Sequence, residues 1–223
     1  VTARECGDEP KLMFERCQCP VAVDPDRRAA VKLLLSSAIE GLDLEEKSVT
    51  TCHGEQYRYD KLVLATGSYP FVPPIPGHMR AGCYVYRTLA DLDAIRDACA
   101  GGRTGVVVGG GLLGLEAANA LRLLGLETHV IEFAPRLMPV QLDAVGGDLL
   151  RSKIQSLGVQ VHVNTATECI VDGESALHRM VFKDGEYLET DVILFSAGIR
   201  PEDRLARNAG LNVGERGGIV IDD

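Results

Sequence analysis

A glycine-rich turn between an apolar run and a helical pattern is the feature that most constrains this chain. The stretch Thr104–Glu132 reads TGVVVGGGLLGLEAANALRLLGLETHVIE. Its apolar run, Val106–Val108, predicts a strand, and the glycines that follow predict a tight turn into a helix. The helix is expected to end at Gly125, and a second strand, Thr128–Ile131, leads to an acidic residue. This order predicts a βαβ unit of an α/β fold.

Three of the glycines have separate roles when such a unit binds a dinucleotide. Gly109 permits the tight turn, Gly111 has no Cβ and lets a pyrophosphate approach the backbone, and Gly114 lets the helix pack closely on the sheet. The N–H groups around Leu112 and Leu113 have no partner within the helix and lie at the positive end of its dipole. These five residues are therefore candidate cofactor-binding residues.

The predicted helix has two faces. Its polar face carries Glu116, Asn119 and Arg122. Its apolar face is expected to be buried and consists of Leu113, Ala117, Leu121 and Leu124.

Glu132 lies at about the sequence position where dinucleotide-binding units carry the acidic residue that binds the ribose. Glu132 follows Gly114 by 18 positions (132 − 114), close to the roughly 20 expected. A carboxylate accepts hydrogen bonds from ribose hydroxyls and repels a 2′-phosphate, so NADH is favoured over NADPH. Arg136 could offset that repulsion. A glycine turn without a ligand is the structural alternative, and the complete strand, helix and acid context disfavours it.

Composition excludes several classes of function. With 223 residues, 46% of them hydrophobic, the chain can form one large domain or two small ones. A net charge of −9 argues against a nucleic acid or an anionic membrane as partner. The sequence has no apolar run of the ~18 residues that a membrane helix needs, and no signal peptide. We expect a soluble cytoplasmic protein.

The seven cysteines are odd in number and scattered, which predicts mostly reduced thiols and no metal site. Cys17 and Cys19, with Cys6 upstream, are the alternative: a metal or redox site. Their spacing differs from the two-residue spacing of zinc and thioredoxin-like motifs, so this alternative is disfavoured.

The remaining sequence predicts further elements. Thr88 and Asp91 form a capping box for a helix to Ala100, and Asp184-Gly185 predicts a hairpin. The buried side of this helix is expected to carry Leu92, Ile95 and Cys99. A second helix is expected to bury Leu142, Val145, Leu149, Ile154 and Leu157. Strands are expected at 33–36, 38–42, 48–51, 62–65, 84–86, 159–163, 178–182, 187–189 and 191–195, with a short helix at 26–33.

Two segments resemble each other, LVLATGSYP (62–70) and ILFSAGIRP (193–201). Each predicts a strand, then a small residue, a glycine and a proline, as at a ligand or a domain crossover. The alternative is a pair of unrelated turns. The proline-rich run Tyr69–Gly77 predicts a stiff linker and a domain boundary.

With these motifs the chain resembles the FAD- and NAD(P)H-dependent pyridine nucleotide–disulfide oxidoreductases, and more specifically the flavoprotein region of NADH-dependent assimilatory nitrite reductase large subunits. The segments that carry the resemblance are YDKLVLATGSYP (59–70), YRTLADLDAI (86–95), GGGLLGLEAANAL (109–121), THVIEFAPRLMPVQLD (128–143), FSAGIRP (195–201) and RGGIVIDD (216–223).

The resemblance implies a Rossmann-like NAD-binding domain, a parallel sheet with helices and a β-meander, inserted between incomplete FAD-domain pieces. The expected domains are an irregular lead-in over 1–30, a partial FAD-binding domain over 31–75, an NAD(H)-binding domain over 76–195 and a returning FAD-binding segment over 196–223. Because the first thirty residues contain no FAD fingerprint, the resemblance also implies a fragment.

The resemblance assigns further residues. Glu116 would face the nicotinamide, and its alternative is an exposed acid favoured by the helix dipole. Arg87 would approach the flavin or the nucleotide. The crossovers near FAD would be formed by Ala65, Thr66 and Gly67 on the outward path and by Ala197 and Gly198 on the return.

The function implied is an oxidoreductase module that passes reducing equivalents from NADH through FAD to a downstream acceptor domain or protein. No catalytic residue is assigned, and a homodimer is left open. One alternative is a non-catalytic NAD(H)-binding or sensing module without flavin. Another is a disulfide reductase that uses Cys17 and Cys19, whose spacing does not match the active-site pair of that family.

Overall fold

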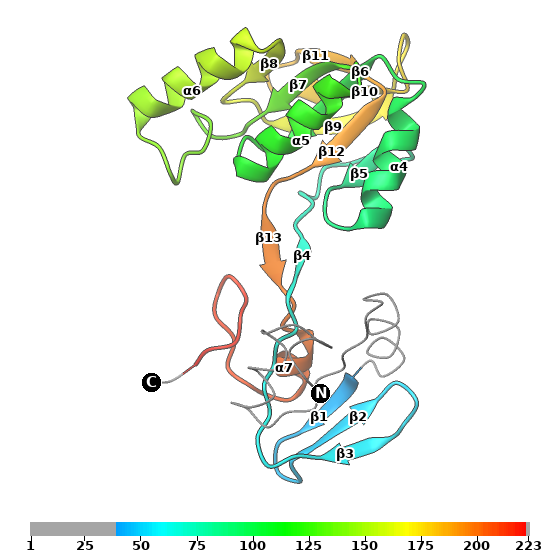
Figure 1. Cartoon of the computed structure of the whole chain (residues 1–223), viewed down its shortest axis with the longest axis vertical. Coiled ribbons are helices and arrows are strands. Elements are labelled where there is room, and N and C mark those ends of the chain that lie inside the picture. The colour runs from blue at the N-terminus through cyan, green and yellow to red at the C-terminus, as the bar shows by residue number, and fades with distance from the viewer. Residues whose placement is uncertain (1–38, 222–223) are drawn as a thin grey trace, which may run out of the picture. The chain divides into compact units, whose positions relative to one another are not determined.

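The computed structural model describes residues 39–221 and divides them into two compact units. Unit 2 is the continuous segment Ser68–Arg200, and unit 1 consists of the described residues before and after it (Figure 1). Unit 2 is therefore an insertion in the sequence of unit 1. It contains the whole of the expected 76–195 domain and extends further at both ends. The predictions for 1–30, 26–33 and 33–36 lie outside the described residues.

A five-stranded parallel sheet forms the centre of unit 2, which confirms the predicted α/β class (Figure 1). Parallel strands are buried on both faces, so they appear in the sequence as short apolar runs rather than as alternating patterns. In spatial order the strands are β5 (Cys83–Val85), β12 (Val192–Phe195), β6 (Thr104–Val108), β7 (Glu127–Ile131) and β8 (Val159–His162).

Helices pack on one face of this sheet. They are α4 (Leu89–Cys99), α5 (Leu112–Leu123) and α6 (Ala144–Ser156). Val107 of β6 and Val130 of β7 point toward them. The buried residues of this layer are Ile95, Cys99, Val107, Ala117, Ala118, Leu121, Leu126, Val130, Leu137, Val159, Val161, Val192 and Leu194.

An antiparallel meander packs on the other face. It consists of β9 (Thr167–Asp172), β10 (His178–Phe182) and β11 (Tyr187–Thr190). Val106 and Val108, the neighbours of Val107, point into this layer, as strand alternation requires. Its buried residues are Val106, Val108, Ile131, Ile170, Met180, Phe182, Ile193 and Phe195. The sequence did not predict β9. In TECIVD only Ile170 is buried, so this strand lacks the apolar or alternating pattern by which the other strands were predicted.

The buried faces of the helices differ from prediction. In α5 the stripe is Gly114, Ala117, Ala118 and Leu121, whereas Leu113 and Leu124 are 49% and 46% exposed. Small residues allow a close approach to the sheet, which a search for large apolar side chains overlooks. Leu92 of α4 was likewise wrongly expected to be buried.

The buried face of helix α6 also differs from the predicted one. It packs through Gly147, Leu150 and Ile154, and Gly147 lies against the stem of Arg136. Three of the side chains expected to be buried are instead exposed: Val145, Leu149 and Leu157.

The two similar segments of the sequence form less strand than predicted. Residues 62–65 are not a strand, and Val63 is exposed. Instead, β4 (Ser68–Pro70) begins one residue before the predicted linker, overlaps its first two residues and pairs with β13 (Ile199–Pro201). The glycines Gly67 and Gly198 both have positive φ, which their turns need.

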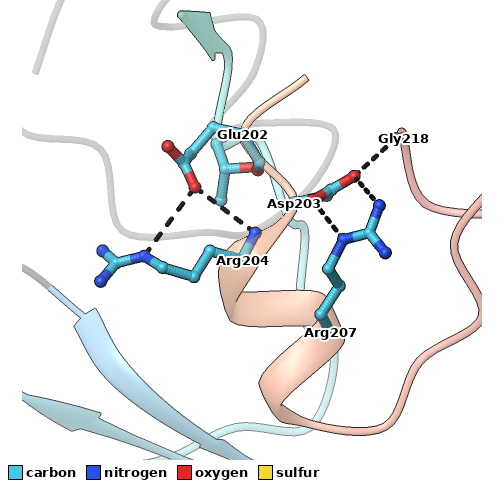
Figure 2. Close-up of polar contacts among 6 residues, drawn as sticks. Glu202, Asp203, Arg204, Arg207 and Gly218 are labelled. Atoms are coloured by element: carbon cyan, nitrogen blue, oxygen red, sulfur yellow. Dashed lines mark hydrogen bonds and ion pairs between the residues drawn. The ribbon is translucent and has the colours of Figure 1, made fainter. Parts of the chain in front are cut away.

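Unit 1 contains a small antiparallel sheet of β1 (Ile39–Asp43), β2 (Ser48–Thr51) and β3 (Gln56–Arg58). Helix α7 (Arg204–Asn208) contacts β1. Figure 2 shows how Asp203 anchors this helix: its carboxylate accepts hydrogen bonds from Arg207, at 2.8 and 3.1 Å, and from the Gly218 N–H at 2.9 Å. Arg207 and Gly218 together keep the pKa of Asp203 below its usual value.

Four cysteines lie in the described residues, namely Cys52, Cys83, Cys99 and Cys169, and all are free thiols. Cys6, Cys17 and Cys19 lie outside these residues. Between residues 39 and 221 no helix is long and apolar enough to cross a membrane, and no group of three or more His, Cys, Asp or Glu side chains could hold a metal ion.

Two imidazoles, buried His129 and half-buried His162, connect β7 and β8. His129 Nδ1 lies 3.0 Å from His162 Nε2, and the rings are stacked. Burial, and then the neighbouring His162, lower the pKa of His129 in spite of Glu127 nearby. Burial and the charge of Arg151 lower the pKa of His162. The folded protein therefore favours two neutral rings.

This pair predicts acid sensitivity. Below about pH 6.5 the unfolded chain binds protons that the folded pair resists, so the free energy of unfolding falls as the pH falls. Urea unfolding at several pH values between about 8 and 5 measures the effect. The double variant His129→Val, His162→Val should show a flatter dependence, whereas exposed His53→Gln should not. An unchanged slope in the double variant would contradict the assignment.

Candidate functional site

A cleft opens in unit 2 where β6, β7 and β12 end. Its volume is about 1040 Å³. The residues next to the strand ends, Gly109, Glu132 and Ser196, all line it. Ligands of open α/β sheets bind outside the carboxyl ends of the strands, so the cleft lies where such a fold places its site.

The glycine turn is closely packed at two of its positions. Gly109 has φ of +121°, and a Cβ on it would lie 2.3 Å from the carbonyl oxygen of Ser196. A Cβ on Gly114 would lie 2.0 Å from the carbonyl oxygen of Gly109. Both distances are far inside van der Waals contact, so the turn and helix α5 can approach each other only with glycine at these positions.

Gly111, unlike Gly109 and Gly114, has open space where a Cβ would be. A Cβ there would meet no atom within 4 Å, and the residue itself lines the cleft. Gly111 is also the N-cap of α5, which has no side-chain cap and no acid in its first turn. Leu112 and Leu113, exposed and in the cleft wall, follow it. The positive end of the helix dipole therefore opens on free space, as an anion site requires.

Glu132 holds the turn from the neighbouring strand. Its carboxylate accepts hydrogen bonds from the Gly110 N–H at 2.6 Å and the Ala134 N–H at 2.7 Å. A carboxylate has about four acceptor positions, so lone pairs remain for a ligand in the cleft. Sequence reasoning did not foresee that the acid would also support the glycine turn.

The hydrogen bonds of Arg136 are made within its own loop. Its guanidinium donates to the carbonyl oxygens of Leu142, at 3.0 Å, and Pro139, at 3.3 Å. Its stem packs on Gly147, and it does not line the cleft. The suggestion that Arg136 offsets the charge of Glu132 is therefore not supported by its position.

Arg87, Ala197 and Gly198 line the same cleft. An Arg87 Nη2 donates to the hydroxyl and carbonyl oxygens of Ser68, at 2.9 and 3.3 Å. The Gly198 carbonyl accepts from the Phe71 N–H at 2.9 Å. Tertiary structure thus brings together residues more than one hundred positions apart in the sequence.

Glu116 and three other predicted residues lie elsewhere. Glu116 is exposed on α5 and does not line the cleft. Ala65, Thr66 and Gly67 belong to unit 1, where the Thr66 hydroxyl donates to the Glu202 carbonyl and the Glu202 N–H donates to the Gly67 carbonyl at 2.9 Å. The predicted outward crossover therefore lies beside the returning chain.

Sequence reasoning missed several residues of the cleft wall. Phe71 lines it, Tyr86 precedes Arg87, exposed Phe133 follows Glu132, and Thr165 and Lys183 come from the meander side. The hairpin signal at Asp184-Gly185 located the turn that carries Lys183. It did not show that the turn borders a site, because that depends on how the meander packs.

Comparison with known proteins agrees with this geometry. The pyridine nucleotide-disulphide oxidoreductase family model matches residues 9–223. The chain belongs to this family. The family assignment confirms the resemblance inferred from the motifs.

Two relatives are nitrite reductase large subunits. The chain is 60% identical to the NAD(P)H enzyme of Klebsiella oxytoca over 193 residues, which is 86% of this chain and 20% of that protein. It is 52% identical to the NADH enzyme of Escherichia coli over 194 residues, 86% of this chain and 23% of that protein. The chain thus spans about a fifth to a quarter of the length of these relatives.

A solved structure with a bound nucleotide is among those that the chain resembles. The water-forming NADH oxidase of Lactobacillus brevis, bound to NADH, matches with a TM-score of 0.75 and 27% identity, over 83% of this chain and 42% of that one.

The glycine geometry predicts different costs at two positions of the motif. Gly114→Ala forces a Cβ against a backbone carbonyl and should lower the free energy of unfolding by about 1–3 kcal/mol. Gly111→Ala places its Cβ in open space and should cost less than about 1 kcal/mol. Urea unfolding followed by circular dichroism compares the two. Equal stability of the variants would contradict the close approach at Gly114.

Proposed function

We propose that unit 2 binds NADH in the cleft, and that the complete enzyme passes reducing equivalents from NADH through FAD to a downstream acceptor, as a nitrite reductase large subunit. The observation that supports this most is the convergence of the open α5 N-terminus and Glu132 on one cleft. The names of the relatives, and the NADH held by the matched oxidase, support the cofactor and the reaction.

In this proposal the pyrophosphate lies at Gly111, against the first N–H groups of α5 at Leu112 and Leu113. No atom of the described residues lies within 4 Å of the position that a Gly111 Cβ would take, so the space is open to a phosphate group. A side chain at this position would fill that space. Gly109 and Gly114 act indirectly, by holding the turn against the sheet.

Glu132 would bind the adenosine ribose through its remaining lone pairs. Because the Gly110 and Ala134 N–H groups already orient the carboxylate, it requires little rearrangement to accept ribose hydroxyls. Arg136 is held by its own loop and does not counter the negative charge. A preference for NADH over NADPH follows.

The other end of the cleft would receive the nicotinamide. Arg87, Ala197 and Gly198 line the cleft and are proposed to lie at that end, and Glu116 is proposed to approach it in the complete enzyme. NADH supplies a hydride when bound, and FAD can accept it. The contribution of this chain is to orient the donor: the sheet positions the glycine turn, and the Arg87 contact with Ser68 holds the side chain at the wall.

For FAD we propose the segments Ala65–Gly67 and Ala197–Gly198, and the domain limits 31–75 and 196–223 remain proposals for its binding pieces. The downstream acceptor would belong to the complete enzyme, and the proposed location is the cytoplasm, in keeping with free thiols. No residue is assigned as a catalytic acid, base or nucleophile, because positioning and the cofactors suffice for hydride transfer.

Calorimetric titration with NADH tests the central claim, after the visible spectrum of the purified chain is recorded. The chain should bind NADH, and Gly111→Val should abolish binding because its side chain occupies the phosphate position. Gly101→Val, at an exposed position that also has open space around it, is the matched control and should bind normally.

Unchanged affinity in a folded Gly111→Val variant would sink the assignment. A colourless chain that binds NADH would show a dinucleotide site without flavin in this chain, and a flavin spectrum would show that the chain holds FAD by itself.

Glu132→Ala tests the ribose contact. Loss of hydrogen bonds to a charged group should weaken NADH binding by about 1–2 kcal/mol and narrow the gap between NADH and NADPH. Titrations with both nucleotides measure this, with exposed Glu168→Ala as the control for net charge. Equal loss for both nucleotides would count against the ribose role and would point to a purely structural support of the glycine turn.

A further inference from the structure

Charge in the cleft wall is sparse. Of its lining residues in the described part of the chain, Arg87, Glu132 and Lys183 are charged. Two of them already have partners inside the protein: Arg87 donates to Ser68, and Glu132 accepts from two backbone N–H groups. Lys183 is therefore the charged residue of the cleft wall whose side chain has no partner among the described residues.

The ammonium group of Lys183 is available to a ligand. The side chain is exposed, and within residues 39–221 it takes part in no ion pair or side-chain hydrogen bond. Its acidic neighbour Asp184 uses a carboxylate oxygen to accept the Glu186 N–H at 3.1 Å, which closes the hairpin turn.

The backbone, by contrast, holds Lys183 firmly in place. Its N–H donates to the Ala166 carbonyl at 2.9 Å, and the adjacent Thr165 N–H donates to the Glu132 carbonyl at 3.0 Å. Two backbone hydrogen bonds thus connect the β10–β11 turn to the end of β7. Lys183 and Glu132, which lie 51 positions apart in the sequence (183 − 132), therefore both line one cleft.

We propose that Lys183 binds a phosphate group of the dinucleotide, an inference that rests on the proposed function. A primary ammonium is a compact charge that pairs strongly with phosphate oxygens. The phosphate has two sources: the bridging pyrophosphate, present in both nucleotides, and the 2′-phosphate, present in NADPH alone. Lys183 would supply the positive charge for a phosphate in a cleft wall that Arg136 does not line.

Calorimetric titration of the 223-residue chain with NADH and with NADPH tests the proposal. Lys183→Gln removes the charge and keeps a polar side chain of similar length, and Lys183→Arg keeps the charge. Lys153→Gln, at an exposed position on α6 outside the cleft, is the matched control for net charge.

The Gln variant at position 183 should raise the Kd about five- to tenfold and reduce its dependence on salt, whereas the Arg variant and the α6 control should stay near wild type. An equal increase for both nucleotides identifies the pyrophosphate as the partner. An increase for NADPH alone identifies the 2′-phosphate.

Two results would overturn the proposal, and they can be told apart. If the wild-type chain binds NADH or NADPH and folded Lys183→Gln binds both with unchanged Kd, Lys183 has no role and the proposed function stands. If the wild-type chain binds neither nucleotide, the proposed function and this inference both fail.

Discussion

The close contact of two glycines with backbone carbonyls is the constraint on which the rest of unit 2 depends. Gly109 lies against Ser196 and Gly114 lies against Gly109, at distances that leave no room for a Cβ. This packing brings the N-terminus of α5 to the carboxyl edge of the sheet. Without it the helix would start farther from β12, and its free N–H groups would not border the cleft.

The two-sided burial of the parallel sheet makes that contact stable. Alternate residues of β6 enter different cores: Val107 packs under the helices, whereas Val106 and Val108 pack under the meander. A shift of one residue in β6 would exchange the two sets and would also move Gly109 out of its turn. The register of the strand and the position of the site are therefore set together.

Carboxylates in both units accept backbone N–H groups and so fix loops. Glu132 holds the glycine turn and Asp203 holds the chain near Gly218 (Figure 2). For Glu132 this support coexists with the proposed contact to a ribose. A residue type and a spacing can predict a ligand contact, but they do not reveal a second role that depends on the neighbouring strand.

The sequence by itself determined the order of elements in the βαβ unit, the glycine turn, the acid at the end of β7 and the family, because these depend on residues close together in the chain. Only the tertiary structure decided which helix faces are buried, since Gly114 and Ala118 pack where Leu113 and Leu124 do not. It alone placed Lys183 in the cleft wall, because that position depends on how the meander packs on the sheet.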